Sequence, residues 1–307
     1  MKLSPVLAGL AALSLSGCMT LDDFSASPFD DEERVAPFPA TAYAQGCGEW
    51  DDWDKPAEPF RLYGDTYYVG TCGITALLIT SPDGHMLIDG GTEAGGKLVA
   101  ENIVKLGFSL RNVRYVTHTQ EHHDHVGGLA HLKEVTGARM VASARAQSVF
   151  ETGILSEDDP QYEGPVEGVP RVTVDELVAD GEAIALAGKS IEAHMTPGHS
   201  PGAITWRWEE CEEEACATIV FSDGLGPFAG DDYRWSEHPE YLADYRGSID
   251  WLAQAGADIC MTAHPSQTKL ISRIGTGGII DPALCAATAA SVRERVDMIV
   301  AEETLAQ

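Results

Sequence analysis

Four histidines and an aspartate lie within eight residues, between His118 and His125. The segment follows an apolar run that ends at Thr117 and precedes a glycine-bearing helix start at Gly127 and Gly128. Imidazole nitrogens and carboxylate oxygens at this density are typical donors to divalent metals. The segment therefore predicts a metal site.

The spacing also allows two adjacent sites. If the backbone stays extended beyond Thr117, residues 118, 120 and 122 share one face, and a turn can bring Asp124 and His125 to a neighbouring point. His199 and His264 each follow a strand-like run and lie in a turn, where loops often present functional groups. A lone histidine is usually structural, but the three stretches together indicate zinc or a similar divalent metal.

The elements that must position these residues alternate along the chain. Period-2 and apolar runs predict strands over 63–69, 75–80, 85–88, 113–117, 139–141, 182–186, 190–195, 203–208, 217–221 and 259–262. Helical spacing predicts helices over 93–106, 127–135, 144–150, 239–255 and 282–303, with loops over 154–169 and 224–236. Two successive sets of strands and helices indicate an α/β fold, a four-layer αβ/βα sandwich. A doubly wound parallel sheet is the competing architecture, and the meander over 60–90 argues against it.

Composition excludes several classes of protein. A hydrophobic fraction of 44% is ordinary for a globular chain. Twenty Lys and Arg against 48 Asp and Glu give a net charge of −28, which opposes nucleic-acid binding. After the first twenty residues, no apolar run approaches the roughly 20 residues that span a bilayer.

The start of the chain indicates export. Lys2, the apolar stretch 5–15 and the sequence Leu15-Ser16-Gly17-Cys18 form a secretory signal, and the last four residues resemble the bacterial lipoprotein processing box. We expect a signal peptide over 1–17, a lipid-anchored tether over 18–50 and a metallo-hydrolase domain over 51–307. Cys18 would carry the lipid and hold a monomeric protein at the outer membrane, facing the periplasm. A plain signal peptide cut nearby is the alternative.

Setting Cys18 aside leaves six of the seven cysteines, an even number that indicates disulfides in an exported chain. Local spacing favours Cys211 with Cys216, which flank an acidic tip between two strand-like runs. Cys47 with Cys72 and Cys260 with Cys285 would then remain. A metal role for Cys211 and Cys216 is the rival interpretation, but no neighbouring histidine supports it.

The histidine pattern resembles the motif of the metallo-β-lactamase superfamily, His-x-His-x-Asp-His followed by two single histidines. Residues 120–125, His199 and His264 match it, with Gln120 in place of the first histidine. Segments 67–71, 87–91 and 196–199 extend the resemblance over about residues 55 to 270 and are similar to class B, subclass 3 β-lactamases. The three disulfides also resemble those of some members of that subclass.

The resemblance implies two zinc ions. Carried over by position, the first has Gln120, His122 and His199 as ligands, and the second has Asp124, His125 and His264. Asp89 would orient a ligand or its water, although it is nearly as well explained as a turn residue before two glycines. His118 could support the first site or replace Gln120, whose spacing fits the motif better. Because an amide oxygen is a weaker donor than imidazole, the first site should be looser.

Relatives usually have serines where Gly224 and Gly226 stand, and those serines help to hold the substrate carboxylate. In this chain that contact is lost or must come from elsewhere. The two glycines can also be interpreted simply as a glycine loop that lines the cleft.

The implied function is antibiotic resistance by a zinc-dependent β-lactamase. A metal-bound hydroxide oriented by Asp124 would attack the β-lactam amide of penicillins, cephalosporins or carbapenems. One alternative is a lactonase or thioester hydrolase of the same superfamily, in which Asp223 would bridge the metals. The other is a zinc-binding lipoprotein with an impaired first site.

Overall fold

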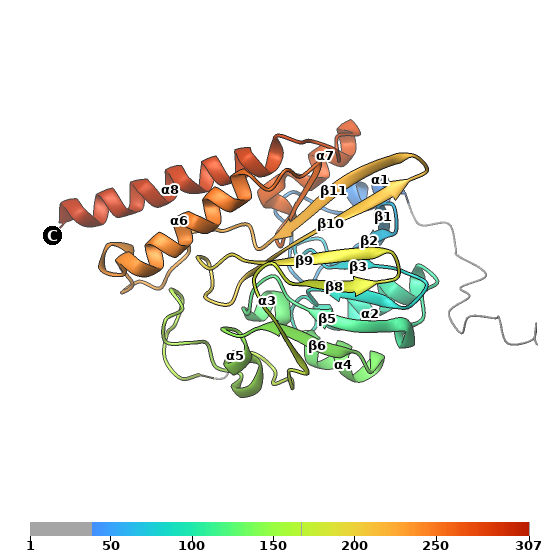
Figure 1. The fold of residues 1–307 in the computed structure, drawn as a ribbon, viewed down its shortest axis with the longest axis horizontal. Helices are drawn as coiled ribbons and strands as arrows, with labels where there is room; N and C mark the ends of the chain where they lie inside the picture. Colours follow the sequence, from blue (N-terminus) through green and yellow to red (C-terminus); the bar gives the residue numbers. More distant parts are fainter. Residues whose placement is uncertain (1–38, 167, 307) are drawn as a thin grey trace, which may run out of the picture.

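Two β-sheets packed face to face form the centre of the molecule, as the computed structural model of residues 39–166 and 168–306 shows (Figure 1). The first sheet has seven strands in the order β1 to β7. β1 to β4 form an antiparallel meander, and β5 to β7 continue in parallel from β4. These strands are β1 (Phe60–Tyr63), β2 (Thr66–Tyr68), β3 (Leu77–Ile79), β4 (His85–Ile88), β5 (Val113–Thr117), β6 (Arg139–Ser143) and β7 (Glu176–Val178).

The second sheet has five strands in the order β12-β11-β10-β9-β8. β8 to β11 are antiparallel neighbours, and β12 joins β11 in parallel. They are β8 (Ala183–Leu186), β9 (Lys189–Met195), β10 (Ile204–Glu212), β11 (Ala215–Ser222) and β12 (Ile259–Thr262).

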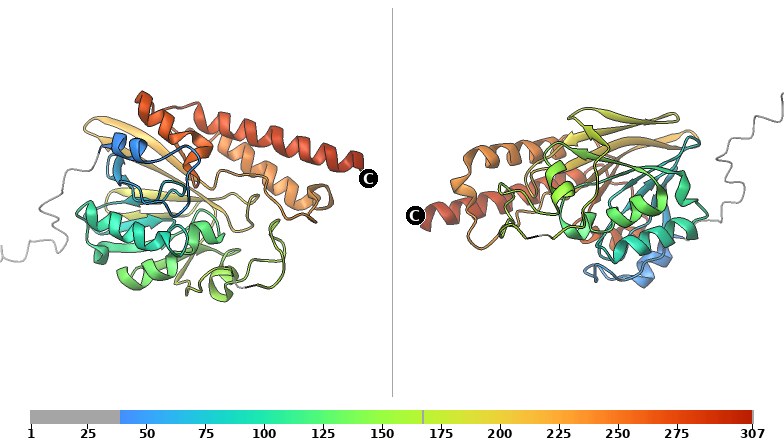
Figure 2. Two further views of the ribbon diagram at one scale, coloured as in Figure 1. Left: turned by 180° about the vertical axis from the view of Figure 1, so that it is seen from behind. Right: turned by 90° about the horizontal axis from the view of Figure 1, so that it is seen from below.

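Helices cover the outer face of each sheet, as the views of Figure 2 also show. One apolar cluster joins the first sheet to α2 (Gly95–Lys105), α4 (Leu129–Thr136) and α5 (Gln147–Thr152). Another joins the second sheet to α6 (Pro239–Ala253) and α8 (Leu284–Ala306). A third fills the space between the sheets, with Trp206 and Phe221 fully buried. The αβ/βα sandwich is confirmed.

Shorter elements complete the described chain. They are α1 (Ala40–Gly46), α3 (His123–Val126), α7 (Leu270–Thr276), and the 3-10 turns η2 (Leu110–Asn112), η3 (Trp235–Glu237) and η4 (Pro265–Thr268).

The predicted strand 63–69 is instead the end of β1, a turn and β2. Gly64 adopts φ +54°, a left-handed conformation that suits glycine and reverses the chain between the two strands. β1, β7, α1 and α7 were not predicted, because each is too short to show a clear apolar period.

The packed fold begins before residue 51, so the expected tether 18–50 is wrong in its last part. α1 contacts α7 and β1, and its Tyr43 is fully buried. The ring of Tyr43 packs at a tilt against those of Phe60 and Tyr68, which makes this segment part of the core. The signal peptide 1–17 and Cys18 lie outside the described residues.

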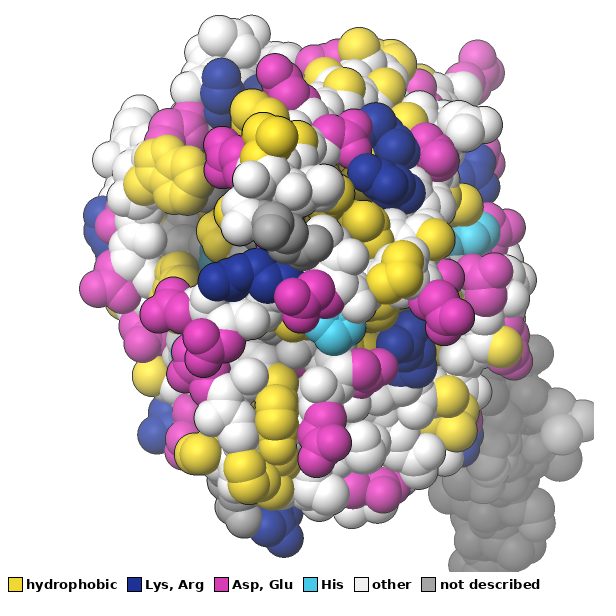
Figure 3. All heavy atoms as spheres, turned by 90° about the vertical axis from the view of Figure 1, so that its left-hand side faces the viewer, with side chains coloured by type: hydrophobic (Ala, Val, Ile, Leu, Met, Phe, Trp, Pro, Cys, Tyr) yellow, Lys and Arg dark blue, Asp and Glu magenta, His cyan; other side chains and the backbone are white. Residues whose placement is uncertain are grey.

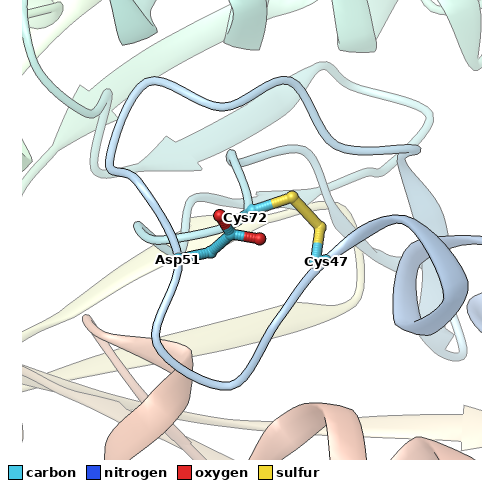
Figure 4. A group of neighbouring side chains, drawn as sticks. All are labelled: Cys47, Asp51 and Cys72. Carbon is cyan, nitrogen blue, oxygen red and sulfur yellow. A yellow bond between two sulfur atoms is a disulfide. The ribbon is translucent and has the colours of Figure 1, made fainter.

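Three disulfides join Cys47 with Cys72, Cys211 with Cys216, and Cys260 with Cys285. Figure 4 shows the first of them, with the Asp51 carboxylate beside it. Oxidised sulfur is not the thiolate that binds zinc. The metal role considered for Cys211 and Cys216 therefore does not fit, and the same holds for Cys47 and Cys72.

Figure 3 shows one face of the molecule, on which acidic, basic and apolar side chains are interspersed. Among the helices of the described residues, none combines the length and apolar content that crossing a bilayer requires.

Candidate metal centre

The histidine motif lies at the carboxyl end of β5, where the first sheet meets loops of the second. Residues 118–122 are irregular, and α3 begins at His123. The Trp206 indole donates to the His118 carbonyl at 2.9 Å, and the Ile204 amide donates to the Thr119 carbonyl at 2.8 Å. The segment is thus fixed to β10 across the sandwich.

The second of the two glycines that follow the motif, Gly128, stands where no side chain fits. A side chain there would collide with the Gly90 carbonyl and with the backbone of Gly96. Only glycine lets the turn after β4 and the first turn of α2 approach the motif so closely.

His122 and His199 form the first pair of candidate ligands, with His122 Nδ1 3.2 Å from His199 Nε2. His199 Nδ1 donates to the Gly226 carbonyl at 2.8 Å, since a carbonyl oxygen only accepts. Burial lowers the pKa of His199 to about 3, so its ring is neutral and Nε2 presents a lone pair. The point between the two nitrogens therefore favours a cation, either a proton on His122 or a metal ion.

Asp124, His125 and His264 form a second group. Asp124 Oδ2 lies 3.0 Å from His125 Nε2 and 3.2 Å from His264 Nε2, and the two nitrogens are 3.2 Å apart. Burial opposes a charge on His125, but the Asp124 carboxylate outweighs it and raises the pKa of His125 to about 10. The same pairing keeps the pKa of Asp124 far below its usual range despite burial.

Both groups fit zinc by their spacing. Nitrogen and oxygen ligands about 2.0–2.1 Å from a tetrahedral zinc ion lie about 3.3 Å from one another. The nitrogen–nitrogen separations of 3.2 Å in the two groups agree with this value.

Asp89 lies beside the second group, and it is also a turn residue. Its carboxylate accepts from the Thr119 amide and hydroxyl, both at 2.7 Å, and faces His125 Nδ1 at 3.7 Å. With φ +66° it turns the chain after β4.

Gln120 is fully buried, and neither its amide nitrogen nor its amide oxygen has a hydrogen-bond partner in the described structure. An unpartnered buried amide is costly unless something else binds it. This observation suits a ligand to a metal ion.

His118 faces elsewhere. Its Nε2 accepts from the Ser143 amide at 3.3 Å, and its ring lies 4.9 Å from that of Phe150. Burial lowers the pKa of His118 to about 3. Within the described structure, its side chain interacts with the backbone of Gln120, the neighbouring candidate ligand. Whether His118 supports the first site stays a prediction.

Two carboxylates at the centre were missed by the sequence analysis. Asp159 Oδ2 lies 3.0 Å from His122 Nε2, and Glu121 accepts from the Ser200 hydroxyl at 2.6 Å and the Gly202 amide at 2.7 Å. Asp159 belongs to a loop without periodicity, and Glu121 is a variable position of the motif, so neither carried a signal.

The places of the two expected serines are filled by other side chains. A side chain at 224 would collide with the Gln267 amide, and one at 226 would meet the Phe228 ring. Phe228 lies 5.8 Å from the His199 ring and is 56% exposed, and Trp53 lies 5.9 Å from the His264 ring and is 42% exposed. Two partly exposed aromatic rings thus border the two groups of ligands.

Asp223, considered as a bridging ligand, lies outside the Asp124, His125 and His264 group. Its Oδ1 accepts from the Leu225 amide at 2.9 Å, and Oδ2 has no partner among the described residues. Burial raises the pKa of Asp223 to about 7.

Comparison with solved structures gives close matches over nearly the whole described fold. The metallo-beta-lactamase MIM-2 is 42% identical with a TM-score of 0.83, over 88% of this chain and 100% of that one. MEM-A1, a subclass B3 metallo-beta-lactamase from a soil metagenome library, is 36% identical with a TM-score of 0.79, over 83% and 100%. BJP-1, a subclass B3 enzyme of Bradyrhizobium japonicum, is 29% identical with a TM-score of 0.73, over 83% and 97%.

Among curated proteins, this chain is similar to hydroxyacylglutathione hydrolases. The hydroxyacylglutathione hydrolase of Gloeobacter violaceus is 27% identical over 60% of this chain, and that of Pseudomonas aeruginosa PAO1 is 32% identical over 35%. The matches span 66% and 33% of the lengths of those two relatives.

The family model of the metallo-beta-lactamase superfamily matches residues 69–264, from the end of β2 to the last histidine of the centre. The match includes every candidate ligand described above. This chain is therefore a hydrolase that belongs to the metallo-beta-lactamase superfamily.

Proposed function

We propose that the protein is a zinc-dependent β-lactamase that hydrolyses the amide bond of β-lactam antibiotics. The observation that carries the proposal is the pair of neighbouring ligand groups, His122 with His199 and Asp124 with His125 and His264, each at zinc spacing. The match to the whole length of MIM-2 at 42% identity, over 88% of this chain, supports the substrate class.

Gln120, His122 and His199 would hold one zinc ion, and Asp124, His125 and His264 the other. When bound, such ions lower the pKa of water and polarise a carbonyl oxygen. Asp124 contacts both histidines of the second group through Oδ2. Its other oxygen is the group we expect to orient the attacking water.

The chain's own residues would also define where the substrate lies. Trp53 and Phe228 offer apolar faces beside His264 and His199. The Gln267 amide, which takes the place of a side chain at 224, is a polar group of the same region. A substrate with an apolar ring system and a polar edge suits these walls.

A thioester hydrolase is the second candidate, favoured by the match to hydroxyacylglutathione hydrolases. A carboxylate that bridges two metals would support it, and Asp223 is the residue considered for that role. Because Asp223 lies outside the second ligand group and is engaged by the Leu225 amide, the β-lactamase proposal is the stronger.

Export is part of the proposal. Three disulfides suit an oxidising compartment such as the periplasm. We expect a Cys18→Ser variant to leave the membrane fraction while retaining hydrolase activity, and equal membrane recovery of both chains would argue against acylation.

Hydrolysis of nitrocefin, a carbapenem and a hydroxyacylglutathione thioester by the purified chain tests the two activities together. We expect the first two to be cleaved, the activity to disappear on chelation and to return with zinc. A protein that holds zinc, cleaves the thioester and leaves both β-lactams intact would establish the second candidate. One that holds zinc and cleaves none would support the impaired lipoprotein.

A further inference from the structure

Asp159 is a buried carboxylate directly behind His122. Its Oδ2 lies 3.0 Å from His122 Nε2, on the side of the ring opposite the nitrogen that faces His199. Only 2% of Asp159 and 7% of His122 are exposed. A carboxylate in this position fixes the ring and its tautomer, because it accepts the proton on Nε2 and leaves Nδ1 free to bind a cation.

The two ligand groups differ in charge. The second contains the Asp124 carboxylate, whereas Gln120, His122 and His199 are all neutral as ligands. An amide oxygen is also a weaker donor to zinc than imidazole. The first group therefore lacks both a negative charge and one strong donor.

From this difference we propose that Asp159 is a positioning residue that retains the metal ion at the first site. It orients His122, increases the electron density on Nδ1, and supplies the negative charge that the direct ligands lack. This inference rests on the proposed metal sites, but it concerns metal affinity and not the choice of substrate.

The surrounding loop holds Asp159 in this position. Oδ1 accepts from the backbone N–H of Gln161 at 2.8 Å, and the backbone N–H of Asp159 donates to the Ser156 carbonyl at 3.0 Å. The next residue, Pro160, accepts from the Gly230 amide at 2.8 Å, which joins this loop to the one that follows β11. The carboxylate is thus fixed by its own loop and by a second loop of the centre.

The test is a zinc titration of the metal-free full-length chain against a chromophoric chelator, which resolves the two dissociation constants. Asp159→Asn keeps the shape and removes the charge. We expect it to weaken one site by about 10- to 100-fold, the range for outer partners of a metal ligand, and to change the other by less than about twofold. When cobalt replaces zinc, Asp159→Asn should change the absorption bands of the weaker site alone.

The neighbouring Asp158 supplies the matched control. It pairs with Arg145 at 2.6 Å on the surface, so Asp158→Asn should leave both constants unchanged. If Asp159→Asn affects folding, the variants to compare are Asp159→Glu and Asp159→Gln, whose side chains have equal length and differ in charge. The glutamate variant should bind zinc more tightly at the first site than the glutamine variant. In a Gln120→His background, the effect of Asp159→Asn should be smaller.

Three results would overturn the proposal. They are an Asp159→Asn chain with both constants unchanged, equal weakening by Asp158→Asn, and a wild-type chain that takes up a single zinc ion. Since no result depends on β-lactam turnover, failure of the proposed function would leave this test interpretable.

Discussion

Glu121 and Ser200 are joined by a hydrogen bond of 2.6 Å between side chains 79 positions apart in the sequence. The same carboxylate accepts from the Gly202 amide at 2.7 Å. The turn that carries His199 is thus attached to the segment that carries His122. Glu121 holds together the two stretches that form the first ligand pair.

Replacing Glu121 by alanine should destabilise the protein and weaken the first metal site. The variant leaves the buried Gly202 N–H without an acceptor, at a cost of about 1–3 kcal/mol in the free energy of unfolding. Urea unfolding of the metal-free chain measures this. Glu121→Gln should retain most of the stability, since an amide can serve both partners. The control Glu151→Ala removes an exposed glutamate of α5 and should have little effect. Equal midpoints for Glu121→Ala and wild type would contradict the assignment.

Gln120→His should tighten the first site, because imidazole replaces a weaker amide donor. We expect an affinity gain of about tenfold, equivalent to about 1.4 kcal/mol. Zinc titration with a competing chelator measures both chains. Identical dissociation constants would show that position 120 does not bind the metal.

Gly224→Ser should lower stability rather than restore a carboxylate contact. The new side chain would collide with the Gln267 amide, and φ +87° is unfavourable for serine. We expect a loss of about 1–3 kcal/mol in unfolding free energy. Gly188→Ser is the matched control, because Gly188 has φ +76° but nothing within 4 Å, so it carries the backbone strain alone. Equal losses in the two variants would leave no role for Gln267.

Asp223 should make the metal-free protein less stable as the pH rises. Burial raises its pKa to about 7 from the 3.8 that is ordinary for an aspartate, so the folded state binds more protons than the unfolded state between these values. The stabilisation is complete below about pH 4 and is lost as the pH rises through 7, by at most on the order of 4 kcal/mol.

Asp223→Asn should remove this dependence, and denaturant unfolding at pH 5 and pH 8 measures it. If the unfolding free energies of the two chains changed with pH in the same way, the Asp223 carboxyl would not be protonated in the folded state. The variant should still bind two zinc ions, and loss of one ion would instead support a bridging role.

The layers of the fold and the six candidate ligands could be predicted from the sequence, because long apolar periods and dense histidines are local signals. It missed Asp159 and Glu121, whose partners lie 37 and 79 residues away. Only the packing of loops brings such carboxylates to the histidines. The loss of serines at 224 and 226 was visible in the sequence, but the side chains that fill their places, Gln267 and Phe228, were not.

The β1–β2 hairpin illustrates a different limit. The run 63–69 looks like one strand, and the turn at Gly64 becomes evident only from its left-handed backbone. Likewise, α1 lies in a segment without helical periodicity, and its position depends on the burial of Tyr43 and on the disulfide of Cys47.

We propose that side chains from three distant stretches hold two metal ions, and that the resulting centre hydrolyses a β-lactam. The most direct test compares kcat/KM for nitrocefin in zinc-loaded Asp124→Ala and His118→Ala chains. Because Asp124 contacts both histidines of the second group, its loss should lower kcat/KM by more than about 100-fold, together with zinc content. His118→Ala should cost less than about tenfold wherever the chain is folded. The opposite ranking, or full activity in Asp124→Ala, would contradict the proposed ligand assignment.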